Sequence, residues 1–291
     1  MMTEPGGLLA QIRAYGSFVR VSHSVFALPF ALVGAALATR QAGFHWLRVV
    51  WIVACMVTAR SAAMGFNRIV DARFDARNPR TAARELPAGR LTMREAWLFV
   101  VVSSALFVAS TVPLGWLCLA LSPVALAIIF WYSLAKRVTA YAQAFLGLAM
   151  AVAPVGGWLA AGGGLSIEPV LLGAAIGAWV AGFDVLYACQ DVAFDRREGL
   201  KSIPVRFGVP RALVMSRALH VLAVLALVAV GLSAALGPVY LAGVAAVGVL
   251  LAWEQSMVRA DDLSQVTRAF DLNGWVGVLY LATTVAAVYW R

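Results

Sequence analysis

The chain has 291 residues, of which 62% are hydrophobic and 13% are charged. Soluble domains carry about 25% charged and about 45–50% apolar residues, so this composition excludes an ordinary soluble enzyme and is typical of a protein that crosses a membrane several times. The formal net charge is +9. In a membrane protein such an excess gathers in cytoplasmic loops beside anionic lipid, so we expect membrane lipid, and no nucleic acid, as a partner.

The apolar stretches predict the membrane topology. Residues 1–20 lack the basic start, apolar core and cleavage site of a signal peptide, so we expect the first helix to stay attached. Since a spanning helix needs about 20 mostly apolar residues, the sequence predicts an all-α polytopic integral membrane protein with about nine transmembrane helices. No linker interrupts it, which favours one domain over residues 1–291. The expected helices are 19–39, 46–66, 95–113, 115–133, 140–162, 168–188, 211–233, 236–253 and 272–290.

The basic residues alternate between loops. They concentrate in the N-terminal segment and in the loops at 67–94, 134–139, 189–210 and 254–271, whereas the intervening loops hold very few. The positive-inside rule then places the N-terminus and these loops in the cytoplasm. We expect a multi-pass protein of the inner (cytoplasmic) membrane whose site faces the cytoplasm.

A polar cluster follows the second apolar stretch. Arg60, Met64, Asn67, Asp71 and Asp75 are three or four residues apart, so they share one face if the helix continues past residue 66. A charge inside a membrane helix costs about 2.5–3.5 kcal/mol, which makes the intramembrane Arg60 a functional candidate.

A second cluster repeats this spacing after the sixth stretch. Asp184, Asp191 and Asp195 are seven and four residues apart, as Arg60, Asn67 and Asp71 are, and Asp184 lies inside the apolar span. Carboxylates gathered in this way repel one another unless cations neutralise them. Mg²⁺ takes oxygen ligands and keeps substrate phosphates as partners, so the clusters predict a magnesium-dependent diphosphate site. The basic residues available to it are Arg68, Arg73, Arg77, Arg80, Arg84, Lys136, Arg137, Arg196, Arg197, Lys201 and Arg206.

The charged clusters also fit roles without catalysis, but less well. Arginine-rich loops often serve topology alone, yet topology does not require two acidic clusters on one side of the membrane. A transporter would place its charges through the depth of the membrane, and a scaffold has no need of Arg60 or Asp184. His23 lines a pocket or only hydrogen-bonds within the bundle; the sequence leaves both open.

With these motifs the sequence resembles the UbiA superfamily of membrane prenyltransferases. The stretch "NRIVDARFD" keeps Asn67, Asp71 and Asp75 of the family's NDxxDxxxD motif but has Arg68 where the family has an aspartate. The second motif, DxxxD, is "DVAFD" at 191–195, and the family's YxxxK is "YSLAK", with Tyr132 and Lys136. The resemblance covers essentially the whole chain and implies nine helices around a central cavity capped by cytoplasmic loops.

The resemblance also implies roles for single residues. Asp184 would orient Lys136 beside Tyr132, and Asp191 is one candidate for accepting the proton released in the reaction, with water and the freed diphosphate as the others. An acceptor carboxylate would bind Arg20 or Arg60. The ligands of two Mg²⁺ ions would be Asn67, Asp71, Asp75, Asp191 and Asp195, and the diphosphate would contact Arg80, Lys136 and Lys201.

The expected reaction is transfer of a polyprenyl group from polyprenyl diphosphate to an aromatic acid in quinone biosynthesis. "VRVSHSVFALPFAL", with Ser22 and His23, is similar to the subset proposed for menaquinone made through futalosine. On that similarity we favour a dihydroxynaphthoate slightly over 4-hydroxybenzoate as the acceptor. Sister enzymes that use haem, homogentisate, chlorophyllide or a glycerol phosphate are the alternative.

Overall fold

The computed structural model describes residues 16, 18 and 27–290, and this part of the chain is helical with no strand. Nine long helices account for most of it. They are α3 (Leu28–Ala42), α4 (Trp46–Asp75), α5 (Met93–Thr111), α6 (Trp116–Val138), α7 (Ala142–Ala160), α8 (Glu168–Ala188), α11 (Val209–Ser233), α12 (Gly237–Met257) and α13 (Val266–Tyr289). Four short helical turns lie between them: η1 (Val112–Leu114), η2 (Cys189–Asp191), α9 (Val192–Arg197) and α10 (Ile203–Phe207).

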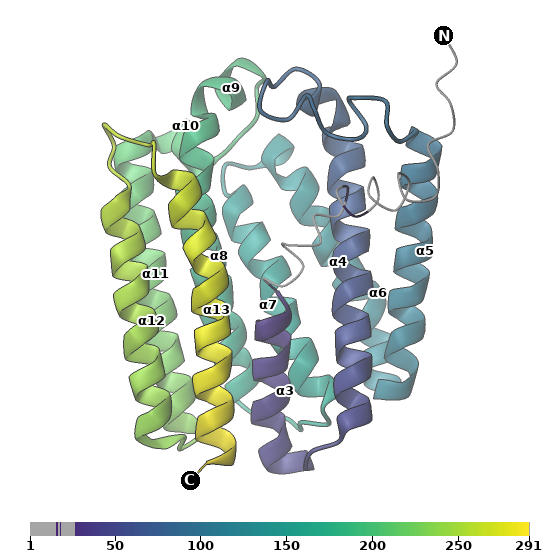
Figure 1. The fold of residues 1–291 in the computed structure, drawn as a ribbon, viewed down its shortest axis with the longest axis vertical. Helices are drawn as coiled ribbons and strands as arrows, with labels where there is room; N and C mark the ends of the chain where they lie inside the picture. Colours follow the sequence, from purple (N-terminus) through teal and green to yellow (C-terminus); the bar gives the residue numbers. More distant parts are fainter. Residues whose placement is uncertain (1–15, 17, 19–26, 291) are drawn as a thin grey trace.

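The expected all-helical membrane architecture is confirmed. Within the described residues, 8 helices are long and apolar enough to cross a membrane. The remaining long helix, α3, has 15 described residues and follows the undescribed segment that ends at residue 26. Figure 1 shows the long helices running up and down side by side, with α9, α10 and the loop after α4 at one end and the C-terminus at the other. This arrangement is that of a polytopic membrane bundle.

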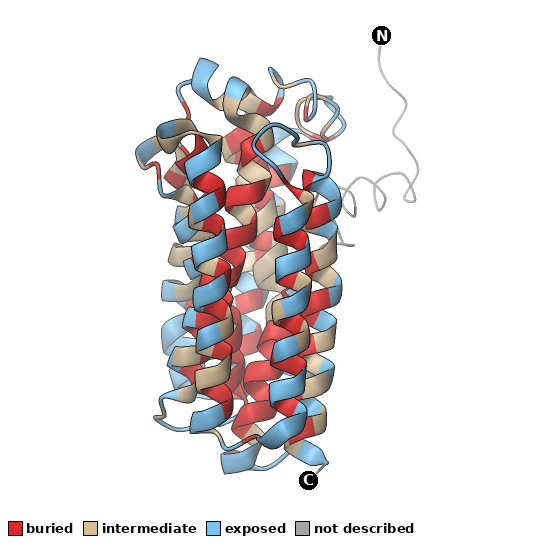
Figure 2. Ribbon diagram, turned by 90° about the vertical axis from the view of Figure 1, so that its left-hand side faces the viewer, coloured by how far each residue is buried: buried red, intermediate tan, exposed pale blue. Residues whose placement is uncertain are grey.

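Neighbouring helices close a ring. Contacts run from α4 and α5 through α6 to α7, and then through α8, α11 and α12 to α13. Helix α13 contacts α3, and α3 contacts α4, which closes the ring. Buried residues lie on the inward sides of the helices and exposed ones on the outward sides (Figure 2). Many of the exposed residues are large and apolar, including Trp46, Leu98, Val101, Leu225 and Val249, as a lipid-facing surface requires.

Glycines allow α3 and α7 to pack closely. A Cβ at Gly34 would collide with the carbonyl oxygen of Pro154, and one at Gly157 would collide with that of Ala31. Small residues at such contacts let two membrane helices approach until their backbones touch. The two helices therefore form a tight wall on one side of the interior.

Turns lie at the two shortest gaps between expected helices, at residue 114 and at residues 234–235. Gly115 (φ 112°) ends the short turn after α5, and Gly237 (φ 78°) begins α12. These positive φ values suit glycine because it has no Cβ.

The two acidic segments differ in local structure. The helix α4 continues to Asp75, nine residues beyond the expected end of its span, so its polar residues do share one helical face. The chain after α8 instead tightens into η2 and restarts as α9, with Asp191 (φ −98°, ψ 3°) at the junction. Asp184, Asp191 and Asp195 therefore do not lie on one continuous helix. They have the same sequence spacing as Arg60, Asn67 and Asp71 on α4, but a different backbone conformation.

Candidate active site

A polar cavity of about 260 Å³ lies at the end of the bundle where α4, α6 and α8 finish. It is lined by five aspartates and four basic side chains: Asp71, Asp75, Asp184, Asp191, Asp195, Arg80, Arg84, Lys136 and Lys201. Asn67 and Tyr132 line it as well. The structure thus brings together the residues of both acidic segments, although 120 residues separate Asp71 from Asp191 in the chain.

The carboxylate of Asp71 connects α4 to the end of α6. It accepts hydrogen bonds from Lys136 Nζ at 2.6 Å and from Arg137 Nη2 at 2.7 Å. Asn67 Nδ2 lies 3.5 Å from the same carboxylate, one helical turn earlier on α4. The Asp71 side chain is buried and its charge is balanced by two cations.

The loop after α4 supplies cations for the other aspartates. Arg84 Nη1 donates to both oxygens of Asp75, each at 2.8 Å. Arg80 Nη2 donates to Asp191 at 2.6 Å, and its Nη1 donates to the Tyr187 hydroxyl at 2.8 Å. Burial alone would lower the pKa of Arg80, but Asp191 and Tyr187 raise it above its usual value, so Arg80 remains charged.

Three further residues line the cavity with different surroundings. The side-chain carboxylates of Asp184 and Asp195 have no hydrogen bond or ion pair with any residue that the structure describes. Lys201 is exposed, and its Nζ donates to the backbone carbonyl of Val138 at 3.0 Å, not to a carboxylate. The Lys201 backbone also donates to the Lys136 carbonyl at 2.7 Å, which fastens the loop after α9 to the end of α6. Two carboxylates thus remain available to a ligand.

The donor set suits a hard cation. Asn67 and the five aspartates offer only oxygen ligands, as Mg²⁺ prefers. In the described residues no three His, Cys, Asp or Glu side chains are close enough to hold one ion. Mg²⁺ is usually bound through one or two carboxylates plus water and substrate phosphates, so the cavity fits an ion that arrives with a phosphate ligand. The five predicted metal ligands stay a prediction.

Arg68, which replaces an aspartate of the family motif, lies outside the polar cavity. Arg68 is buried on α4, and its Nε lies 3.5 Å from the carbonyl oxygen of Phe18. It is absent from the lining of the polar cavity. Arg68 thus contacts the N-terminal segment and does not add a fifth cation to the cavity.

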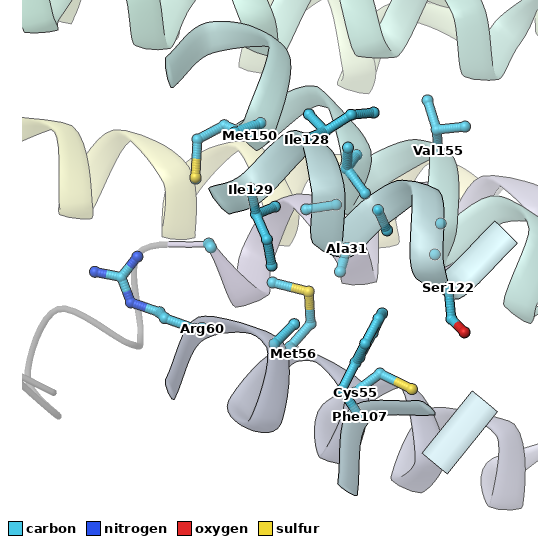
Figure 3. Close-up of a pocket in the computed structure, with 18 of the residues that line it drawn as sticks. Ala31, Cys55, Met56, Arg60, Phe107, Ser122, Ile128, Ile129, Met150 and Val155 are labelled. Atoms are coloured by element: carbon cyan, nitrogen blue, oxygen red, sulfur yellow. The ribbon is translucent and has the colours of Figure 1, made fainter. Parts of the chain in front are cut away.

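An apolar cavity of about 400 Å³ adjoins the polar one between α3, α4, α5, α6 and α7. Tyr132 and Leu146 line both cavities. Arg60 lies at one end of the apolar cavity, and its buried Nε has no hydrogen-bond partner among the described residues. Figure 3 shows its guanidinium there, with Met56 and Ile129 in the middle and Cys55, Phe107 and Ser122 towards the other end. A single buried cation in an apolar cavity is suited to binding an anionic group.

Two predicted site residues cannot be placed, and three contacts were not predicted. Arg20 and His23 lie outside the described residues. The sequence-based site lacks Tyr187. Arg84 and Arg137 are among the basic residues that the sequence offers to the site, but their pairing with Asp75 and Asp71 was not predicted. Tyr187 follows Asp184 by three residues and precedes Asp191 by four, a helical spacing that could have indicated it. Nothing in the spacing indicates which loop arginine pairs with Asp75, because the loop path decides that.

Comparison with known proteins agrees with this geometry. Residues 27–282 match the UbiA prenyltransferase family. A 4-hydroxybenzoate octaprenyltransferase of Azotobacter vinelandii is 34% identical over 237 residues, which cover 81% of this chain and 80% of that protein. The match extends over most of the membrane bundle and both acidic segments.

Solved structures give the same result. The apo structure of a UbiA homologue from Aeropyrum pernix K1 is 36% identical, with a TM-score of 0.83 over 91% of this chain and 97% of that chain. A UbiA homologue from Archaeoglobus fulgidus bound to DMAPP and Mg²⁺ is 21% identical, with a TM-score of 0.72 over 95% of this chain and 99% of that chain, and shows the shared fold. The chain therefore belongs to the UbiA prenyltransferase family and is a membrane-embedded prenyltransferase.

Proposed function

We propose that the protein transfers a polyprenyl group from polyprenyl diphosphate to an aromatic acid in quinone biosynthesis, with Mg²⁺ as the cofactor. The main observation is the contact between two unlike cavities at Tyr132 and Leu146. One cavity has the charges for a diphosphate and its metal ions, and the other has the apolar walls for a prenyl chain. A polyprenyl diphosphate has the same division into a charged head and an apolar tail.

The polar cavity is the proposed site of the diphosphate. Arg80 and Lys136 donate to aspartates in this structure, and we propose that they donate to diphosphate oxygens when the donor binds. Lys201, at the exposed edge, contacts the same group. The aspartates and Asn67 then turn their oxygens to the cations that accompany the diphosphate; the proposed ligands are Asn67, Asp71, Asp75, Asp191 and Asp195. Bound Mg²⁺ neutralises the diphosphate and makes it a better leaving group.

The apolar cavity protects the reactive intermediate. When the bond between the prenyl carbon and the diphosphate oxygen breaks, the electron pair leaves with diphosphate and an allylic cation remains. The aromatic ring attacks that carbon and then loses a ring proton, which restores aromaticity. Few polar groups line the cavity besides Arg60 and Tyr132, so water is kept away from the cation. The proposed role of Asp184 is to orient Lys136 beside Tyr132.

Arg60 is the proposed partner of the acceptor carboxylate. Its Nε is buried without a hydrogen-bond partner in the part of the chain that the structure describes, and leaving such a donor unpaired is costly unless an anion binds there. Tyr132 lies between Arg60 and the polar cavity, so an acid held by Arg60 would have its ring close to the point where the diphosphate leaves. Arg20 and His23 stay as further proposed substrate contacts.

The relatives support 4-hydroxybenzoate as the acceptor and an octaprenyl chain as the donor, because the Azotobacter vinelandii protein and a Xanthomonas campestris protein, also 34% identical, are both named 4-hydroxybenzoate octaprenyltransferases. Dihydroxynaphthoate remains the second candidate, on the resemblance at Ser22 and His23. Both acids offer a carboxylate to Arg60 and an electron-rich ring.

We also propose that the polar cavity faces the cytoplasm from the inner membrane. Helices α9 and α10 lie at the same end of the bundle as the cavity, and so does the loop that follows α4. This end contains Arg73, Arg77, Arg80, Arg84, Arg196, Arg197 and Arg206. By the positive-inside rule such an end stays in the cytoplasm.

The test is an assay with the protein in membranes. Labelled octaprenyl diphosphate is incubated with 4-hydroxybenzoate, with dihydroxynaphthoate or without acid, each with Mg²⁺ or with EDTA. We expect a labelled product that needs both Mg²⁺ and one of the acids. Asp191→Asn should insert normally and abolish turnover. No product with either acid, or full turnover in EDTA, would contradict the proposal.

A further inference from the structure

A second apolar pocket lies beyond the first cavity, at the end of the bundle opposite the aspartates. It has a volume of about 220 Å³ and lies between α3, α4 and α13. Ala36, Val49 and Leu281 are among its apolar lining residues. At its outer rim the Thr39 and Tyr289 hydroxyls are hydrogen-bonded at 2.8 Å. The pocket is therefore walled by three helices, with this hydrogen bond at its rim.

One residue belongs to the walls of both apolar spaces. Ile52 lines both of them and is 3% exposed. On the facing wall Ala160 lines the first cavity and its neighbour Ala161 lines the second pocket. Ile52 lies eight residues before Arg60 on α4, which is about 12 Å along the helix axis. The second pocket thus continues the first cavity in the direction that leads away from the diphosphate site.

The volume of the first cavity limits the chain that it can enclose. A cavity of about 150 Å³ holds one benzene ring, which has one carbon more than an isoprene unit. The 400 Å³ of the first cavity then encloses about two or three isoprene units. An octaprenyl chain has eight units, so its far end must go elsewhere. The second pocket has room for about one or two more.

We propose that the pocket around Val49 is a distal binding site for the prenyl chain of the donor and that Ile52 is the partition which long chains must displace to enter it. This inference rests on the proposed function, because it takes polyprenyl diphosphate as the donor. It makes Ile52 and Val49 determinants of chain-length preference, without any contact to the reacting atoms.

The competing path is sideways into the lipid. Val124 on α6 and Leu148 on α7 line the first cavity and are 52% and 51% exposed, so a chain could leave between these helices. On that path the second pocket would hold a lipid acyl chain or nothing that affects the donor. The two paths differ in their dependence on Val49, because it lines only the second pocket.

Val49→Trp fills the second pocket, and Val50→Trp is the matched control. Val50 is the next residue on α4, is 52% exposed and lines neither space. Membranes with each variant are assayed with geranyl diphosphate, which has two isoprene units, and with octaprenyl diphosphate. We expect Val49→Trp to lower kcat/KM for octaprenyl diphosphate by about tenfold, a typical penalty for a misfitted apolar pocket, and to leave geranyl diphosphate unchanged. Val50→Trp should change neither.

Two further variants keep the result decisive. Val285→Trp fills the same pocket from α13, at a partly exposed position where a larger side chain need not disturb the fold. Ile52→Ala removes the partition and should raise the ratio of octaprenyl to geranyl kcat/KM. If neither pocket-filling variant changes the ratio, the chain leaves sideways and the distal site is wrong. If the unmodified protein transfers neither donor, the proposed function fails instead, which is a different outcome.

Discussion

Replacing Asp71 with asparagine tests whether the charges of the polar cavity act as one unit. The change removes a negative charge and keeps the size of the side chain. In the structure the Asp71 carboxylate accepts from Lys136 Nζ at 2.6 Å and from Arg137 Nη2 at 2.7 Å. The carbonyl oxygen of the introduced amide could accept from one of them, but both cations would lose the charge that balances them.

The size of the effect follows from burial. Removing one partner of a fully buried ion pair costs about 3–5 kcal/mol, whereas an exposed pair is worth about 0.2–1 kcal/mol. The Asp71 side chain is 5% exposed, but those of Lys136 and Arg137 are 32% and 25% exposed, so solvent screens part of the loss. We expect a loss of about 2–3 kcal/mol in the free energy of unfolding, or about 5–10 °C in Tm for a chain of this size.

The assay combines thermal unfolding in detergent with prenyl transfer in membranes. Asp71→Asn should lose at least about 100-fold in turnover, since it misplaces Lys136 and removes a proposed metal ligand. The double variant Asp71→Asn/Lys136→Met should regain part of the stability, because one unbalanced charge is gone, and none of the activity. Asp262→Asn is the control: Asp262 lies in the exposed loop between α12 and α13, and its carboxylate accepts from the Ser264 backbone at 2.9 Å.

Two results would refute this reasoning. If Asp71→Asn keeps most of its turnover, the carboxylate neither holds a metal nor positions Lys136. If its Tm falls by no more than that of Asp262→Asn, the ion pairs of Asp71 contribute nothing to stability. A variant that is stable but inactive would support the role of Asp71 in turnover and contradict its role in stability.

Three shorter predictions concern other parts of the molecule. Arg60→Gln should raise the KM of the aromatic acid at least about tenfold, since a charge-assisted hydrogen bond is lost, and should leave the KM of the prenyl diphosphate unchanged. Equal changes in the two KM values would contradict the proposed role of Arg60. Gly157→Ala should lower Tm, because its Cβ meets the Ala31 carbonyl, while Gly156→Ala, which has open space, should not; similar Tm values would disprove the close α3–α7 contact. Asn273→Leu should cost about 1–2 kcal/mol, because buried Asn273 accepts from Trp179 Nε1 at 2.7 Å; an unchanged Tm would argue against that bond.

The agreement between sequence and structure is greatest where the signal is local. The long apolar runs predict the helices, and the spacing from Asn67 to Asp75 predicts a shared face that the continuation of α4 provides. The expected helix 168–188 agrees with α8, but the tight turn at Cys189–Asp191 and the short helix α9 after it were not predicted, because a few residues of helix leave no mark in the apolar pattern. The same limit explains the missing Tyr187, whose role depends on where Arg80 arrives from a different segment.

The sequence by itself determined the class of the protein and predicted the chemistry of its site. An apolar run long enough to span a bilayer has few conformations open to it, and intramembrane charges such as Arg60 and Asp184 are too costly to lack a purpose. Only the tertiary structure decided which cation pairs with which aspartate, that the polar cavity touches the apolar one, and that Ile52 lines both the apolar cavity and a second pocket. These features depend on contacts between residues far apart in the chain, and packing, not spacing, sets such contacts.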